Sequence, residues 1–473
     1  MKYFNVTGLC VKGKHYMADI SAKLDKIADM VARGRYFTIN RARQYGKTTT
    51  LFLLEETLQD EYTVISISFE GLGDESFESP AAFCRAFTLL IHDALEFTDA
   101  PEEYKESWLD KDVVDFIGLS RHITKMCKGR KLVLMIDEVD KTSNNRVYLH
   151  FLGVLRDKFL KREKDRDHTF HSVILAGVYD IKNIKLKMIN EGAYTPSATE
   201  NRLYNSPWNI AVSFSVDMSF SPPEIATMLS DYESDHHTGM EVDAIAGEIY
   251  EYTSGYPYLV SRICQCIDEE LDKDWTKTGV QNAVKAILEE KSVLFDDIAK
   301  NMENNKELYD FLYSLLIVGE NKTYAITSPV IEWASMFGYI KKGKTYSGGN
   351  GSGPAVIANK IFEMLLSYHF CSKDENVTRM DSSISRGLRY EVARDGVFDM
   401  ELCLRKFAEH YRELFSEADA PFLERHGRLL FLSYLKPLVN GQGFYHIESE
   451  FTDLRRMDIV VDYGSEQFIV ELK

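Results

Sequence analysis

The chain has 473 residues, 45% of them hydrophobic, and a formal net charge of −17. This length indicates roughly three domains and the hydrophobic content excludes a disordered chain, while the acidic balance argues against indiscriminate nucleic-acid binding. The sequence contains no run of about 18 apolar residues, and its first residues lack the apolar stretch of a signal peptide. We therefore expect a cytoplasmic protein with no membrane partner.

An amphipathic helix is predicted first, because Ile20, Leu24, Ile27 and Val31 recur at helical spacing. The next segment, residues 36–54, reads YFTINRARQYGKTTTLFLL. It combines a short strand, a tight loop and the start of a helix, which is the order found in nucleotide-phosphate cradles.

The loop carries the residue types that phosphate binding requires. Gly46 lets backbone N–H groups approach a phosphate at a positive helix N-terminus, Lys47 would reach the β- and γ-phosphates, and Thr48 would offer its hydroxyl to Mg²⁺. The full Walker A pattern has glycine where this chain has Arg41, so a solvated loop that contains GKT by chance is the alternative. The expected ATP-binding residues of the loop are Arg43, Gln44, Tyr45, Gly46, Lys47, Thr48 and Thr49.

A second informative segment is KLVLMIDEVDK, residues 131–141, in which five apolar residues precede Asp137 and Glu138. It resembles a Walker B strand of P-loop ATPases. Asp137 would then hold the Mg²⁺ hydration shell and Glu138 would polarise the attacking water. A buried strand followed by an Asp-capped helix is the alternative.

Further strands are predicted at residues 62–69, 172–178 and 208–214, alternating with helices as in a doubly wound, mostly parallel α/β sheet. Asp180 follows one of these strands, where related ATPases place a γ-phosphate sensor. Arg156 and Arg162 could reach a phosphate in the same or a neighbouring subunit, which leaves homo-oligomerisation open. Ordinary surface charge is the alternative for both arginines.

A small helical lid is predicted after Ser221, because serine and proline together start a helix. Within it, TSGYPYLV at residues 253–260 resembles the lid signature of signal-transducing ATPases. This resemblance implies that the region of Pro257 lies against the nucleotide base, and a plain helix boundary is the alternative.

A winged-helix segment is predicted next, with a basic hairpin at residues 339–346. Lys341, Lys342 and Lys344 would face phosphates if this module bound DNA, and an internal interaction surface is the alternative. The Gly/Ser run that follows is predicted to be a flexible loop.

The remaining chain is predicted to be helical over residues 397–438 and then to form strands at 444–451, 457–463 and 467–473. Asp458 lies on one strand, and Glu471 and Lys473 lie on the next, which gives the order D…ExK. The same order is common in ordinary hairpins.

Together these features resemble a prokaryotic family that joins an AAA-like P-loop ATPase to a PD-(D/E)XK nuclease domain. The family loop is arginine-rich before Gly-Lys-Ser/Thr, as at Arg41 and Arg43. The resemblance implies that Asp458 and Glu471 bind Mg²⁺, that Lys473 activates water, and that Glu424 is the acidic residue of the first helix of the nuclease fold. Because the sequence stops at Lys473, we expect the nuclease-like domain to be incomplete and to cleave poorly.

We accordingly expect a P-loop AAA-like ATPase domain (1–215), a helical lid (216–290), a winged-helix-like domain (291–372) and a nuclease-like domain (373–473). ATP with Mg²⁺ would control an action on nucleic acid, with DNA as the candidate partner. One alternative is a non-catalytic ATP-dependent switch or scaffold, for example in phage defence. Another is a DNA-binding regulator that does not cleave.

Overall fold

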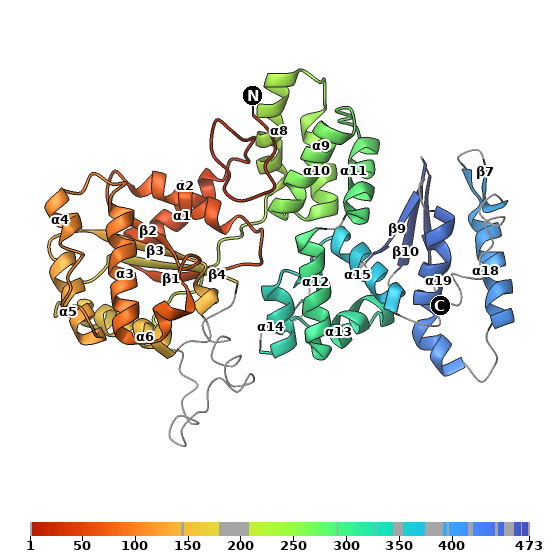
Figure 1. Cartoon of the computed structure of the whole chain (residues 1–473). Coiled ribbons are helices and arrows are strands. Elements are labelled where there is room, and N and C mark those ends of the chain that lie inside the picture. The colour runs from red at the N-terminus through yellow and green to blue at the C-terminus, as the bar shows by residue number, and fades with distance from the viewer. Residues whose placement is uncertain are drawn as a thin grey trace. The chain divides into compact units, whose positions relative to one another are not determined.

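A computed structural model describes most of the chain, in two compact units that comprise Met1–Ser219 and Phe220–Lys473 (Figure 1). No helix in the described part is long and apolar enough to cross a membrane. The described residues are 2–142, 146–178, 208–290, 292–325, 327–343, 353–373, 391–394, 397–414, 420–439, 443–448, 458–464 and 466–471.

The first unit is built on a parallel four-stranded sheet with the order β1-β4-β3-β2. Every residue of β3 and β4 is buried, as expected for strands covered on both faces. The parallel α/β architecture predicted from the sequence is confirmed. The strands are β1 (Tyr36–Asn40), β2 (Thr63–Ser68), β3 (Leu132–Asp137) and β4 (Ser172–Gly177).

The predicted strand at residues 208–214 is wrong, because only Val212 bridges to Phe37 of β1. The backbone turns at Trp208, whose carbonyl accepts a hydrogen bond from the N–H of Ala211. The buried Trp208 indole donates to the hydroxyl of Thr38 at 3.1 Å. This anchored indole starts a turn where a strand would have run beside β1.

Helices cover both faces of the sheet. One continuous core joins alternate strand residues to buried side chains of α3, α5 and α6, while α1 and α2 pack together and α2 also contacts β2 and β4. The helices are α1 (Ser21–Ala32), α2 (Lys47–Leu58), α3 (Pro80–Leu95), α4 (Glu102–Glu106), α5 (Phe116–Cys127) and α6 (Arg146–Arg162). Short 3₁₀ turns lie at Asp74–Phe77 and Val139–Thr142.

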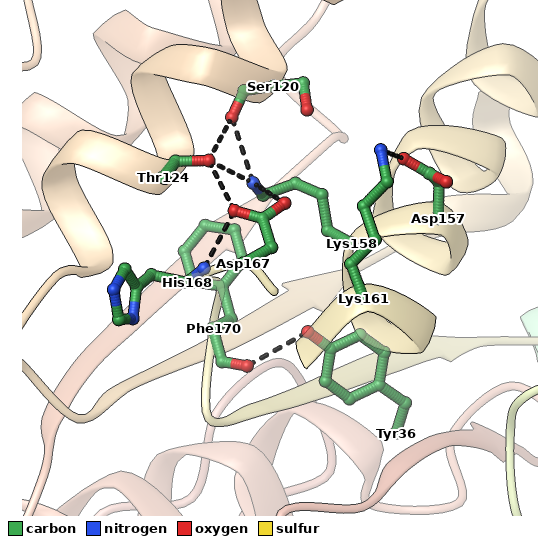
Figure 2. Close-up of polar contacts among 9 residues, drawn as sticks. All are labelled: Tyr36, Ser120, Thr124, Asp157, Lys158, Lys161, Asp167, His168 and Phe170. Atoms are coloured by element: carbon green, nitrogen blue, oxygen red, sulfur yellow. Dashed lines mark hydrogen bonds and ion pairs between the residues drawn. The ribbon is translucent and has the colours of Figure 1, made fainter. Parts of the chain in front are cut away.

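A buried ion pair ties α6 to α5 and to the segment before β4 (Figure 2). Lys158 is fully buried, and its Nζ lies 2.9 Å from Oδ2 of Asp167. The same amine donates to the hydroxyl of Thr124 at 2.7 Å and to the carbonyl of Ser120 at 3.0 Å. Because every proton of the ammonium has an acceptor, this buried charge is compensated.

The second unit begins with four helices in the region predicted as a lid. Ser221 and Glu224 form a capping box at the start of the first helix, which confirms the predicted helix start. The four helices are α8 (Pro222–His236), α9 (Val242–Thr253), α10 (Pro257–Glu270) and α11 (Lys277–Glu289).

A small helical module with two short strands follows. Strands β5 and β6 pair antiparallel, so the predicted hairpin at residues 339–346 is wrong: the second strand comes after the Gly/Ser run. Lys344 lies outside the described residues. The elements are α12 (Val293–Asn304), α13 (Lys306–Tyr313), a π-helical turn (Ser314–Val318), α14 (Pro329–Met336), β5 (Ile340–Lys342), β6 (Ala355–Ile357) and α15 (Lys360–Lys373).

The last part of the chain forms an antiparallel sheet with the order β11-β10-β9, and α15 and α19 both contact β9. The helix predicted from Val397 begins instead at Met400, because Val397 and Phe398 pair with β7. The elements are β7 (Ala393–Arg394), β8 (Val397–Phe398), α18 (Met400–Leu414), α19 (Ala420–Val439), β9 (Gly443–Glu448), β10 (Asp458–Tyr463) and β11 (Glu466–Val470).

Candidate functional site

The loop between β1 and α2 opens directly into the first turn of a helix. Gly46 is the N-cap of α2 and has a φ of 75°, a conformation that glycine adopts at little cost. Glycine has no side chain with which to cap the helix, so the first N–H groups of α2 face the loop. This geometry suits an anion.

Arg41 is accommodated where the sequence pattern would have placed glycine. In the described part of this loop the positive φ values belong to Gln44 and Gly46, so position 41 has no need of glycine. The Arg41 guanidinium donates to the carbonyls of Asn40 at 2.8 Å and Val216 at 2.9 Å, and it lies over the ring of Phe214. The departure from the pattern therefore leaves the loop geometry intact.

Lys47 lies inside the loop with 7% of its surface exposed. Its Nζ donates to the carbonyls of Arg41 and Ala42 at 3.1 and 3.0 Å. Burial lowers the pKa of the Lys47 amine, although the carboxylates of Glu138 and Asp140 oppose that shift. The loop thus curls around one amine that can meet an incoming phosphate.

Thr48 and Asp137 meet between the start of α2 and the end of β3. The Thr48 hydroxyl donates to Oδ2 of Asp137 at 2.6 Å, and Oδ1 of Asp137 accepts from the N–H of Glu138 at 2.9 Å. A hydroxyl beside a carboxylate is an oxygen donor set that suits Mg²⁺. Glu138 follows with a positive φ of 54°, which is uncommon for a residue with a side chain.

Burial and the neighbouring charges shift the pKa of Glu138 upward. Burial raises its pKa above the ordinary carboxyl value, the charges of Asp140 and Asp137 add to the increase, and Lys47 opposes it. A half-buried carboxyl beside a metal-type donor set has the chemistry of a water-polarising base.

A family model described as an AAA-like domain matches residues 8–291, which is more than half of the chain. The chain belongs to this AAA-like domain family. Its AAA-like domain includes the loop, the Asp137–Glu138 pair and the helices α8 to α11.

The chain is similar to a curated protein and to solved structures. An uncharacterised WD repeat-containing protein of Synechocystis sp., slr0143, is 23% identical over 289 residues, which are 59% of this chain and 22% of that protein. The Walker-type ATPase PABY2304 of Pyrococcus abyssi superposes with a TM-score of 0.52 at 11% identity, over 77% of this chain and 99% of that one. The ORC1 protein of Aeropyrum pernix, solved with DNA, gives a TM-score of 0.33 at 14% identity, over 74% and 93%. The likeness to PABY2304 agrees with the α/β fold and parallel sheet of the first unit.

Two features of the AAA-like domain were missed from the sequence. Asp140, two residues after Glu138, accepts from the N–H of Val178 at 3.1 Å, and the pattern D-E-x-D could have indicated it. The N–H of Cys10 donates to the hydroxyl of Thr49 at 3.2 Å. No local pattern indicates this second contact, because it joins residues 39 positions apart.

The other residues predicted to contact the nucleotide differ in exposure and in hydrogen-bond partners. Arg43 and Gln44 are exposed, and the Tyr45 hydroxyl lies 2.7 Å from that of Ser219. Pro257 is the buried first residue of α10 in the second unit, and its contact with a base stays a prediction.

None of the contacts described above involves the two candidate arginines or the candidate sensor. Asp180 lies outside the described residues. Arg162 donates to the carbonyls of Phe170, His171 and Gly34 and is therefore structural. Arg156 lies on α6 and is partly buried, and its contact with a phosphate stays a prediction.

The predicted nuclease-like residues lie in the second unit. Glu424 belongs to α19, Asp458 is the first residue of β10, exposed Glu471 follows β11, and Lys473 lies outside the described residues. The register pairs Ile459 with Val470, so the next positions along the two strands are 458 and 471. The structure thus brings two of the predicted metal ligands to neighbouring backbone positions.

Proposed function

We propose that the AAA-like domain binds ATP with Mg²⁺ and hydrolyses it. The observation that carries the proposal is the 2.6 Å bond from the Thr48 hydroxyl to Asp137, with the buried amine of Lys47 and the carboxyl of Glu138 beside it. The N–H groups at the start of α2 and Lys47 would bind the phosphates. Glu138 would orient and polarise the attacking water.

Magnesium fits the donors that the chain offers. Thr48 and Asp137 provide a hydroxyl and a carboxylate at the helix start, and Mg²⁺ is usually held by one or two carboxylates together with substrate phosphates. The bound ion would supply charge neutralisation on those phosphates.

Phosphate release from ATP tests this proposal. The wild-type chain should release phosphate when Mg²⁺ is present and should stop when the metal is chelated, and Lys47→Ala should abolish release. Glu61→Gln is a control, because Glu61 is an exposed acid that lies beyond the C-terminal end of α2, away from the loop. Equal phosphate release by wild type and Lys47→Ala would contradict an ATPase site in this loop.

We further propose that the nucleotide state controls the C-terminal sheet as a nuclease-like domain that acts on DNA or RNA with Mg²⁺. This is supported by the neighbouring register positions of Asp458 and Glu471. Glu448 is paired with Asp458 on the other side, so Glu448, Asp458 and Glu471 occupy neighbouring backbone positions at one end of the sheet. Two carboxylates at strand ends suit a hard cation beside phosphate.

The competing proposal of a DNA-binding wing is weakened by one contact. The Nζ of Lys341 donates to the hydroxyl of Ser254 at 2.9 Å, so this lysine is engaged within its own unit. A DNA-binding regulator would show strongly salt-dependent duplex binding without cleavage.

Incubation with plasmid, linear DNA and RNA, with and without ATP and Mg²⁺, separates these possibilities. Cleavage that is lost in Asp458→Asn and kept in Glu466→Gln, an exposed acid on β11, would support the nuclease-like domain. Binding without cleavage would favour a switch or scaffold.

A further inference from the structure

Asp140 connects the turn that follows β3 to the end of β4. It lies in the 3₁₀ turn Val139–Thr142, two residues after Glu138. Its Oδ1 accepts a hydrogen bond from the backbone N–H of Val178 at 3.1 Å, and Val178 directly follows β4. Because the sheet order places β3 and β4 side by side, this bond fastens two adjacent strand ends to each other.

The approach of Asp140 to β4 depends on a glycine. A Cβ atom at Gly177 would lie 2.3 Å from Oδ1 of Asp140 and 3.1 Å from a methyl group of Val139. The first distance is far below any van der Waals contact, and Val139 is fully buried and cannot yield easily. Only glycine at position 177 lets the carboxylate reach the N–H of Val178.

Glu138 is held on both sides in an unusual conformation. Its N–H is bound by Oδ1 of Asp137 at 2.9 Å, and its φ of 54° lies in the left-handed region. A non-glycine residue is strained in that region and persists there where its surroundings impose it. Asp137 constrains the residue from the strand side, and the Asp140 bond constrains the turn that follows.

We propose that Asp140 is a positioning residue for ATP hydrolysis: its bond to Val178 holds the turn that carries Glu138 against the end of β4. This inference rests on the proposed ATPase function. Asp140 acts through the backbone and through Glu138, and it is assigned no contact with phosphate. Misplacing a catalytic group by about 1 Å can cost on the order of 100-fold in rate.

Two substitutions at Asp140 separate its hydrogen bond from its charge. Asp140→Ala removes the acceptor, so kcat for ATP should fall by about 10- to 100-fold while KM stays within about twofold, because Lys47 and the start of α2 remain in place. Asp140→Asn keeps a side-chain oxygen that can accept from Val178, so it should restore most of the lost kcat. A role in nucleotide binding would instead raise KM.

Gly177→Ala tests the same bond from the other side. The added methyl group displaces the carboxylate, so this variant should reproduce the kcat loss of Asp140→Ala. The double variant should be little worse than either single variant, because both remove one interaction. Asp157→Ala is the control, since Asp157 forms an exposed pair with Lys161 on α6 and should leave kcat unchanged.

The outcomes separate this inference from the proposed function. If Glu138→Gln abolishes hydrolysis while Asp140→Ala keeps wild-type kcat, the positioning role is overturned and the ATPase stands. If the wild type does not hydrolyse ATP, both are overturned. If Asp140→Ala melts early, the folded Asp140→Asn variant decides: kcat as low as that of Gly177→Ala contradicts the role, and near wild-type kcat supports it.

Discussion

The hydroxyl of Thr48 donates a hydrogen bond to Oδ2 of Asp137 at 2.6 Å, and this bond joins the first turn of α2 to the end of β3. The two residues are 89 positions apart. Their contact follows from the parallel order β1-β4-β3-β2, which brings the carboxyl ends of β1 and β3 to the same edge of the sheet. We propose that this edge binds the phosphates and metal of ATP.

Removing the Thr48 hydroxyl should weaken ATP binding only when Mg²⁺ is present. We expect Thr48→Ala to raise the Kd for Mg-ATP by about tenfold or more, equivalent to about 1.4 kcal/mol, and Thr48→Ser to restore it. Calorimetric titration with ATP, in Mg²⁺ and in chelator, measures the difference. Thr57→Ala, at the other end of α2, is the control; a Thr48→Ala affinity equal to wild type in Mg²⁺ would argue against a metal contact.

The buried pair of Lys158 and Asp167 should matter for stability far more than its exposed neighbour (Figure 2). Lys158→Met leaves the Asp167 carboxylate without its cation in the interior, and we expect a loss of about 3–5 kcal/mol in the free energy of unfolding. Lys161→Met breaks an exposed pair with Asp157 and should cost no more than about 1 kcal/mol. Urea unfolding compares them, and equal losses would refute the distinction.

Acid should remove part of the stability that Asp167 provides. Burial opposes ionisation of Asp167, but hydrogen bonds from Thr124 and Lys158 outweigh it and hold its pKa below the ordinary 3.8. A carboxyl with a lowered pKa in the folded state stabilises fully above the unfolded pKa and loses that contribution as the pH falls through its folded pKa. The stability advantage of wild type over Asp167→Asn should therefore be constant from pH 7 to pH 5 and should shrink at pH 3. An advantage that does not change with pH would contradict this ionisation.

We expect the backbone at position 255 in the second unit to require glycine whether or not a nucleotide is bound. Its φ is 75°, and a Cβ atom would lie 1.9 Å from the carbonyl oxygen of Phe220. Gly255→Ala should cost about 3 kcal/mol or more, whereas Gly247→Ala, in the open middle of α9, should gain about 0.5–1 kcal/mol. Thermal melting of the two variants gives the comparison. Similar melting temperatures would show that the Phe220 segment can move aside.

The sequence predicted the parts of the fold that depend on local pattern. The strand, loop and helix at residues 36–54 and the apolar strand before Asp137 have strong periodicity and distinct residue types, so their existence and their meeting at one sheet edge could be inferred. The helix start at Ser221 was predicted in the same way, from its serine and the prolines that follow. These features need no information from distant residues.

The errors arose where distant residues decide the local conformation. The turn at Trp208 depends on a hydrogen bond to Thr38, and the pairing of β5 with β6 joins two short strands that are separated by a segment whose length no local pattern fixes. The pattern D-E-x-D could have indicated Asp140, but its bond to the backbone N–H of Val178, which follows β4, depends on the tertiary fold. At position 41 the sequence pattern suggested that a required glycine was missing. The backbone there has no positive φ, so Arg41 fits without strain.

The most direct measurement is the identity of the nucleotide that the purified chain retains after incubation with ATP and Mg²⁺ and rapid desalting. Wild type should retain ADP, Glu138→Gln should retain mainly ATP because it lacks the water-polarising carboxyl, and Lys47→Ala should retain neither. Chromatography of the nucleotide released from each protein identifies what wild type and the two variants retain. Glu61→Gln is the control and is expected to match wild type. Equal retention of nucleotide by wild type and Lys47→Ala, or ADP in Glu138→Gln as in wild type, would contradict an ATP-hydrolysing site built on Lys47, Asp137 and Glu138.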